Sequence, residues 1–237
     1  SLVIFRMARN KIKQRETDHQ LILLEQKALQ SMMNPHFIFN TLGSIQNYLL
    51  QSKSEEAGLY LSQFARLIRL NISSINSALI SLDEEVNRLK IYMDLEQLRT
   101  DNKFEYIVEF EQGIDEEEVY IPSMIIQPFV ENSIWHGISA IEGKGMIRIS
   151  FSMQSAKALN IIVEDNGVGI MQSKKYSTRT EDHLHLSMEM IRKRLEILGK
   201  KMKVKTGMVI CEASPGNDNP GTRVVITMPF SKNENGT

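Results

Sequence analysis

The chain has 237 residues, of which 42% are hydrophobic and 24% charged, and this composition excludes collagen-like and intrinsically disordered proteins. The length allows two modest globular units. The formal net charge of -1 provides no overall attraction to polyanions, so we expect no direct nucleic-acid partner. The single cysteine, Cys211, excludes an intramolecular disulfide framework, and we interpret it as a buried apolar residue.

A short apolar run opens the chain and is followed by a basic stretch. Leu2 to Phe5 are apolar, and Lys and Arg residues recur between Arg6 and Arg15. A transmembrane helix ends in this way on its cytoplasmic side, although a frayed basic terminus has the same pattern. We expect residues 1–20 to form a juxtamembrane or linker helix, in the cytoplasmic portion of a membrane-anchored protein.

The first half of the chain has helical periodicity. Apolar spacing and the absence of glycine before Gly43 predict an amphipathic helix from about Ile12 to Leu50, interrupted only by Pro35. A second helix is predicted over residues 55–75 by the same spacing. The first half therefore indicates a helical bundle.

A third helix is predicted from Ser81 to Arg99. Ser81 and Glu84 have the spacing of a capping box, in which the serine hydroxyl accepts a hydrogen bond from the backbone of the glutamate. Apolar residues along this stretch mark its inner side.

The hydrophobic period changes after Thr100. Residues 104–110 alternate between apolar and polar, which predicts a strand. Strands interleaved with helices follow, and this order indicates an α+β protein or a mixed α/β sandwich. The later predicted elements are an acidic turn (115–118), a helix (near 122–136), strands (146–153 and 159–163), a loop (165–170), a polar segment (to 182), a helix (to 198) and two strands (204–211 and 223–228).

Pro35 and His36 mark a candidate reactive position in the first helix. Proline lacks an amide hydrogen and should kink the helix, leaving His36 accessible. A neutral imidazole has a free lone pair with which it can attack phosphorus, and Asn40, one turn later on the same face, could orient the ring. For a Pro-His pair alone, a kinked core helix with a surface histidine is the simpler interpretation. We expect Phe37, Ile38, Phe39 and Leu42 to lie in the bundle core.

Asn132 and His136 are candidates for a metal and nucleotide site. They lie four residues apart on a predicted helix, which places both on one face. A carboxamide can ligate Mg²⁺, which takes substrate phosphates and water as further ligands. An isolated helical asparagine is more often simply solvated.

Asp165, Gly167 and Gly169 form a second candidate group after the apolar strand. The carboxylate would stand at the strand end, where it could accept a hydrogen bond from an adenine amino group, and the glycines allow close backbone approach. A plain turn explains the same residues equally well.

Ser187 begins the remaining polar group, at the start of the late helix. Its hydroxyl and the free amides of a helix N-terminus could bind phosphate. The basic residues 192–194 could neutralise phosphate charge, but solvated side chains near a helix end are the simpler interpretation. His183 and His185 lack a nearby third ligand, so we assign them no metal.

Four strings of this sequence resemble motifs of the LytS/YehU-type sensor histidine kinases, in family order and over roughly residues 26–230. The phosphate loop that the family pattern places at 185–195 lacks both of its glycines here. The four strings are the phosphoacceptor box (33–42), the N box (127–137), the G1 box of the GHKL, or Bergerat, ATP-binding fold (165–169) and the closing glycine box (221–222).

The resemblance implies an α+β architecture with two domains. A helical dimerisation and phosphoacceptor domain would span residues 21–101, and a GHKL α/β sandwich with a mixed sheet would span 102–232, with a tail at 233–237. His36 would be autophosphorylated from ATP and would pass its phosphoryl group to an aspartate of a response regulator, often one of the LytTR DNA-binding type. The protein would be a homodimer.

The resemblance also assigns the ATP and Mg²⁺ sites. Asn132 inherits the metal-binding role, and His36 with Asn40 would form the catalytic pair. The nucleotide-binding residues implied by the matching boxes are Asn132, His136, Asp165, Gly167, Gly169, Ser187, Gly221 and Thr222.

Two other functions fit the same motifs. A GHKL ATPase would hydrolyse ATP, but those enzymes place a water-activating glutamate one turn before the metal asparagine, where this chain has Pro128. A degenerate kinase acting as a signalling scaffold would bind ATP without labelling of His36.

Overall fold

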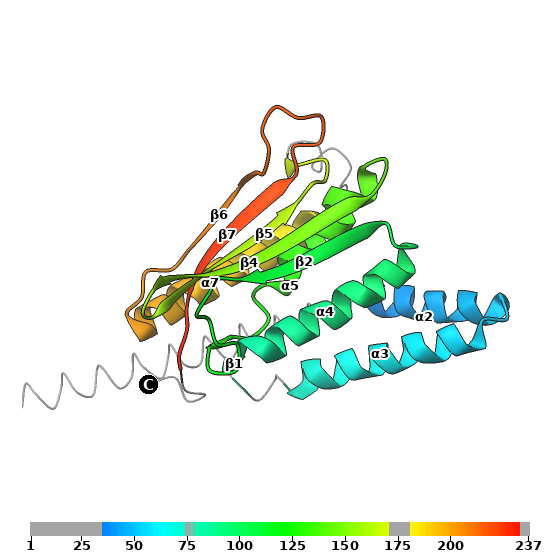
Figure 1. The fold of residues 1–237 in the computed structure, drawn as a ribbon, viewed down its shortest axis with the longest axis horizontal. Coiled ribbons are helices and arrows are strands. Elements are labelled where there is room, and N and C mark those ends of the chain that lie inside the picture. The colour runs from blue at the N-terminus through cyan, green and yellow to red at the C-terminus, as the bar shows by residue number, and fades with distance from the viewer. Residues whose placement is uncertain (1–34, 74–76, 78, 171–180, 233–237) are drawn as a thin grey trace, which may run out of the picture.

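The computed structural model describes residues 35–73, 77, 79–170 and 181–232, with an N-terminal helical hairpin and a sheet covered by helices on one face (Figure 1). Helices α2 (Pro35–Leu50) and α3 (Ser54–Ser73) form the hairpin. The predicted linker at 1–20, the rest of the first predicted helix with its kink, and the tail at 233–237 lie outside the described residues. Within those residues, no helix combines the length and apolarity needed to cross a membrane.

Helix α4 (Leu82–Arg99) begins where the capping pattern predicted. The Ser81 hydroxyl accepts a hydrogen bond from the backbone N–H of Glu84 at 3.2 Å. Acidic residues in the first turn interact favourably with the positive end of the helix dipole. The strand just before it, β1 (Leu79–Ser81), pairs antiparallel with β3 (Tyr120–Pro122). Neither short strand was predicted, because three residues are too few to show a period.

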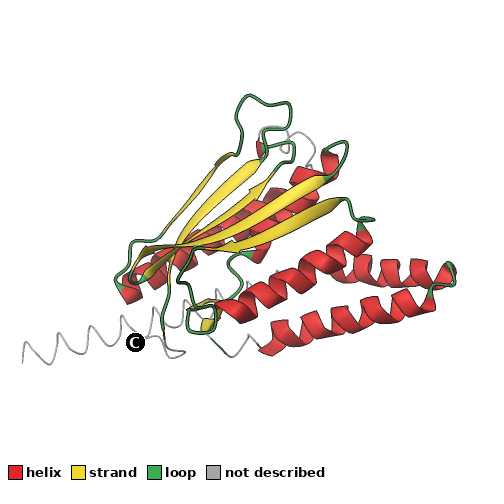
Figure 2. Ribbon diagram, viewed as in Figure 1, coloured by secondary structure: helices red, strands yellow, loops and turns green. Residues whose placement is uncertain are grey.

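A mixed sheet of five strands lies above helices α4, α5 (Gln127–Asn132) and α7 (Glu181–Met202) (Figure 2). Its strand order is β2-β4-β5-β7-β6, with β2 and β4 parallel and the other neighbours antiparallel. The predicted α+β class with a mixed sheet is therefore confirmed. The strands are β2 (Phe104–Phe110), β4 (Gly145–Ser155), β5 (Ala158–Asp165), β6 (Gly207–Glu212) and β7 (Thr222–Pro229).

Several predicted boundaries differ from the structure. The helix expected near residue 122 begins only at Gln127, because Pro122 ends β3 and a turn over residues 123–126 follows it. It consists of α5 (Gln127–Asn132), the π-helical turn η2 (Ser133–Gly137) and the 3₁₀ turn η3 (Ile138–Ala140). Helix α7 (Glu181–Met202) runs past the predicted end at 198, and β6 starts three residues later than the strand predicted from 204.

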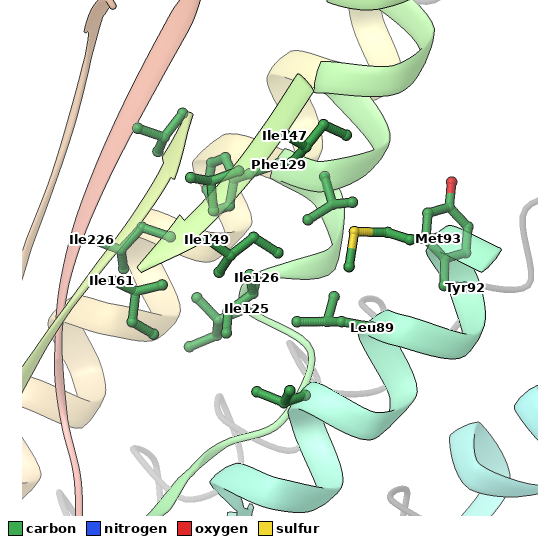
Figure 3. Packing of buried hydrophobic residues seen from close by; sticks show 14 of the residues in the cluster. Leu89, Tyr92, Met93, Ile125, Ile126, Phe129, Ile147, Ile149, Ile161 and Ile226 are labelled. Atoms are coloured by element: carbon green, nitrogen blue, oxygen red, sulfur yellow. The ribbon is translucent and has the colours of Figure 1, made fainter. Parts of the chain in front are cut away.

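One continuous hydrophobic core joins α4 to the sheet and α5 (Figure 3). Leu89 and Met93 of α4 are buried in the same cluster as Phe129 of α5 and Ile147 of β4. A helix that belongs to the predicted first domain thus packs into the core of the predicted second one. The division at residue 101 stays a prediction, and α4 connects its two sides physically.

Two expectations about burial are wrong for the single chain. Cys211 is exposed, because it lies on β6 at the free edge of the sheet. Phe39 is 71% exposed and Leu42 is 50% exposed, whereas Phe37 of the same helix packs against the core. The outer side of α2 is therefore apolar but uncovered within one chain.

Candidate functional site

The N-box segment combines α5 with a π-helical turn, and it brings Ser133 and Gly137 against Asp165. Ser133 donates a hydrogen bond from its hydroxyl to Asp165 Oδ2 at 2.8 Å. A Cβ atom on Gly137 would lie 2.9 Å from Asp165 Oδ1. Asn132 and His136 precede these two residues and are half-buried. π-Turns inside α-helices often occur at functional sites, and this one replaces the regular helix expected from the sequence.

Asp165 is the last residue of β5 and is 3% exposed. Its Oδ1 accepts hydrogen bonds from the backbone N–H of Gly167 at 2.9 Å and of Thr222 at 3.2 Å. Burial raises the pKa of Asp165 above its ordinary value, and the hydrogen bonds from Gly167, Ser133 and Thr222 offset part of that rise. The carboxylate is thus positioned by groups from three separate segments.

Glycines allow the backbone to close around this carboxylate. A Cβ on Gly167 would lie 2.3 Å from the carbonyl carbon of Gly137, and one on Gly221 would lie 2.0 Å from the Asp165 carbonyl oxygen. Gly221 also has a φ of +64°, which favours glycine. We call Ser133, Gly137, Asp165, Gly167, Gly221 and Thr222 the Asp165 cluster.

Gly169 lies next to this cluster rather than within it. Its φ is +79°, and a Cβ there would lie 2.5 Å from Cγ of Pro220. The structure therefore brings Asp165, Gly167, Gly169 and Gly221 close together.

Asn132 and His136 stand beside the Asp165 cluster with different chemistry. Within the described residues, the Asn132 carboxamide makes no hydrogen bond, and no group of three His, Cys, Asp or Glu side chains could hold a metal. Burial lowers the pKa of His136, which favours a neutral imidazole at pH 7. Any ion at Asn132 would need oxygens from a substrate and from water.

The late helix contributes a buried arginine rather than a phosphate-binding one. Arg194 is 3% exposed, and its Nη1 donates to the carbonyl oxygen of Ser123 at 2.5 Å. This contact joins α7 to the segment before α5. The side chain of Ser187, the predicted phosphate ligand, lies outside the described residues.

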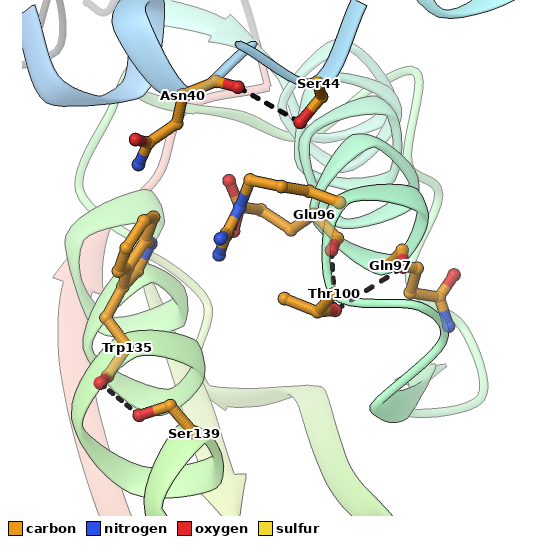
Figure 4. Close-up of polar contacts among 8 residues, drawn as sticks. Asn40, Ser44, Glu96, Gln97, Thr100, Trp135 and Ser139 are labelled. Carbon is orange, nitrogen blue, oxygen red and sulfur yellow. Dashed lines mark hydrogen bonds and ion pairs between the residues drawn. The ribbon is translucent and has the colours of Figure 1, made fainter. Parts of the chain in front are cut away.

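The candidate phosphoacceptor lies on α2, although the His36 side chain is outside the described residues. Its neighbour Phe37 packs with its ring centroid 5.4 Å from that of Tyr92 and 6.0 Å from that of Phe64. Figure 4 shows the Asn40 side chain directed toward the Trp135 ring of the N-box segment. The phosphoacceptor helix thus packs close to the segment that carries Asn132.

Sequence reasoning missed Ser133 and Gly137. Both lie inside the N box, where Ser133 follows Asn132 and Gly137 ends the matching string. The available signal was their spacing of four residues, which places a hydroxyl and a glycine on one side of a helix. Only the tertiary structure shows that this side of the helix contacts the Asp165 carboxylate.

The family model for histidine kinases matches residues 24–104. Sensor histidine kinase/phosphatase LytS of Staphylococcus aureus is 30% identical over 226 residues, which cover 92% of this chain and 37% of LytS. Sensor histidine kinase YpdA of Escherichia coli is 35% identical over 146 residues, covering 62% of this chain and 25% of YpdA. The histidine kinase domain of the blue-light activated kinase from Erythrobacter litoralis EL346 aligns with 93% of this chain at a TM-score of 0.48 and 16% identity.

The helical hairpin followed by a helix-covered mixed sheet defines an α+β protein. Its candidate site is a buried carboxylate, Asp165, beside the N-box segment. The chain belongs to the histidine kinase family, and the predicted likeness to the LytS-type sensor histidine kinases is confirmed. The chain spans about two fifths of the length of LytS and a quarter of that of YpdA.

Proposed function

We propose that this chain is the kinase portion of a sensor histidine kinase, which transfers the γ-phosphoryl group of ATP to His36 and then to an aspartate of a response regulator. The observation that carries the proposal is the Asp165 cluster, in which the closing glycine box, the G1 box and the N box meet around one buried carboxylate. Three motifs that are separated in sequence thus contribute to a single site.

The Asp165 carboxylate has room for one more hydrogen bond. A carboxylate offers about four lone-pair sites. Three are used by Ser133, Gly167 and Thr222. The fourth fits the amino group of adenine, the role that the resemblance implies for this residue. The three internal hydrogen bonds would hold the carboxylate in place before the nucleotide arrives.

Mg²⁺ fits Asn132 as a single protein ligand. A half-buried carboxamide that makes no hydrogen bond within the described residues is free to ligate an ion whose other ligands are phosphate oxygens and water. When bound, Mg²⁺ would neutralise phosphate charge during transfer. The neutral His136 adds no competing charge there.

His36 would act as the nucleophile, and the proton chemistry is simple. A neutral imidazole attacks through the nitrogen that carries no hydrogen, so no proton must leave the attacking atom. Positioning and charge neutralisation would then supply most of the catalysis. Asn40, one helical turn from His36, would orient the ring.

A homodimer would cover the outer side of the helical hairpin. Large apolar side chains are exposed there within one chain, and a second copy offers the same surface. We further propose a membrane-anchored full-length protein and a response regulator of the LytTR type as the partner. The exposed apolar residues of the hairpin are Phe39, Leu42, Leu49, Leu50, Leu59, Leu61 and Ile72.

Incubation with γ-labelled ATP and Mg²⁺ tests the proposal directly. Wild type should acquire acid-labile, base-stable label, and His36→Gln should acquire none. His19→Gln is a matched control, because it removes a histidine from the leading segment and should label like wild type.

The rival functions give different results in the same assay. Equal label on His36→Gln would refute His36 as the sole acceptor. ATP binding without label would indicate a signalling scaffold, and release of free phosphate without phosphoprotein would indicate an ATPase. Pro128 at the start of α5 supplies no carboxylate that could activate water, which supports transfer over hydrolysis.

A further inference from the structure

The buried side chain of Tyr92 on α4 contacts two segments that are far apart in sequence. It is 1% exposed and belongs to the hydrophobic core drawn in Figure 3. Its ring is 5.4 Å from the ring of Phe37, the residue after His36. Its hydroxyl accepts a hydrogen bond from the indole N–H of Trp135, three residues after Asn132.

Burial keeps the Tyr92 hydroxyl protonated, and charged neighbours add to this effect. Burial raises the pKa of Tyr92 well above its ordinary value, and the nearby carboxylates of Glu131 and Glu96 raise it further. The hydroxyl can therefore donate one hydrogen bond while it accepts the one from Trp135. A permanently protonated tyrosine is suited to holding a contact rather than to transferring a proton.

Arg99 also contacts Trp135. The guanidinium carbon of Arg99 lies 4.1 Å from the centroid of the Trp135 ring. The same guanidinium donates to Glu96 Oε2 from Nε at 3.0 Å and from Nη2 at 2.6 Å. Because Glu96 is buried, this ion pair is shielded from water and the cation–π contact is fixed in place.

Helix α2 is anchored along α4 at two levels. The ring contact between Phe37 and Tyr92 lies near its start, and the Tyr48 hydroxyl donates to the carbonyl oxygen of Leu98 at 3.3 Å near its end. Between them, Figure 4 shows Asn40 directed toward Trp135. The position of α2 relative to the N-box segment is therefore set by side chains of α4.

We infer that Tyr92 is a positioning residue for phosphoryl transfer, which holds the phosphoacceptor helix α2 in register with the N-box segment that carries Asn132. The inference rests on the proposed function of this site. In-line transfer requires reacting atoms about 3 Å apart, so a displacement of about 1 Å can cost orders of magnitude in rate. Tyr92 would act through its contacts with Phe37 and Trp135.

Tyr92→Phe separates this role from simple packing. The variant keeps the ring that packs on Phe37 and loses only the hydroxyl that contacts Trp135. Tyr106→Phe is the matched control. It removes a tyrosine hydroxyl on β2 that donates to Asp94 of α4, the helix that carries Tyr92, at 2.6 Å. Each variant loses one hydrogen bond that involves α4. Only Tyr92→Phe loses a hydrogen bond between α4 and the N-box segment.

The first readout is kinetic and uses the full chain. In Tyr92→Phe the rate constant for labelling at saturating Mg-ATP should fall about 10-fold, while the Kd for Mg-ADP stays within about 2-fold of wild type. Tyr106→Phe should keep both values within about 2-fold. Equal labelling rates in the two variants would overturn the inference.

The second readout does not depend on kinase activity. Hydrogen exchange in residues 37–50 should slow when Mg-ADP binds to wild type and to Tyr106→Phe, and should respond much less in Tyr92→Phe. Trp135 is the only tryptophan in the chain, so its fluorescence reports nucleotide binding in the same samples.

The outcomes distinguish this inference from the proposed function. Protection of α2 without label on His36 would refute phosphoryl transfer and leave the coupling through Tyr92 in place. Nucleotide binding without any response of α2 in wild type would overturn the coupling, whether or not His36 is labelled. A wild type that binds no Mg-ADP would overturn both.

Discussion

The Asp165 cluster is buried within one chain, whereas the α2–α3 hairpin leaves large apolar side chains exposed. Asp165 is 3% exposed, with three donors from separate segments and glycine contacts that leave no space for a Cβ. On the hairpin, by contrast, Phe39 is 71% exposed and Leu50 is 77% exposed. Within the cluster, the carboxylate makes three of the roughly four hydrogen bonds open to it, whereas the hairpin leaves large apolar side chains exposed within one chain.

The two regions differ because one must hold a ligand-binding group in place and the other must bind a partner. The nucleotide site needs a carboxylate in one fixed place, and internal hydrogen bonds with close backbone contacts provide that. The hairpin needs a partner, and an exposed apolar side is suited to binding one. Substitutions in the first region should therefore act on folding, and those in the second on assembly.

Gly167→Ala should have the largest effect, because the new Cβ would lie 2.3 Å from the backbone of Gly137. We expect a loss of about 3 kcal/mol in the free energy of unfolding, measured by urea denaturation, because the two backbone segments must separate. Gly207→Ala is the control, since no atom lies within 4 Å of its Cβ position. It should be neutral or stabilise by about 0.5 kcal/mol. Similar losses in both variants would contradict the close packing of the cluster.

Phe39→Asp should weaken the proposed homodimer without destabilising the folded chain. Losing one buried aromatic contact costs about 2 kcal/mol, which raises the dimer Kd roughly 30-fold. Analytical ultracentrifugation would measure it. Val209→Asp is the control, because Val209 is also apolar and is 62% exposed, but lies on β6. Equal weakening by both variants would place the dimer contact elsewhere.

Glu131→Gln should flatten the dependence of stability on pH. Burial, with the nearby charge of Glu96, raises the pKa of Glu131 from 4.5 to about 7, although hydrogen bonding from Gln127 opposes the rise. The folded state therefore binds the proton more tightly, so this group's contribution is complete below pH 4.5 and is lost as the pH rises to about 7.

The expected size is about 1 kcal/mol, because the side chain is only partly shielded from solvent. Urea denaturation of wild type and variant between pH 4.5 and 7 would measure it. Glu117→Gln removes an exposed carboxylate of the acidic turn and should leave the wild-type slope unchanged. A variant slope equal to that of wild type would show that Glu131 has an ordinary pKa in the folded protein.

Local signals in the sequence predicted most of the elements. The capping box at Ser81 and the alternation over residues 104–110 both correspond to structure, because caps and periodicity act over a few neighbouring residues. The short strands β1 and β3 were missed for the same reason, since their pairing joins residues about forty positions apart. Cys211 was wrongly placed in the core because its exposure depends on β6 being the edge strand.

The sequence by itself determined the α+β class, the order of the motifs and the identity of the candidate reactive residues. Only the tertiary structure decided how those residues are held. Asp165 is bound by Ser133, 32 positions before it, and by Thr222, 57 positions after it. Tyr92 likewise joins Phe37 to Trp135. Such contacts depend on how distant elements pack, and no local pattern of residue types records that packing.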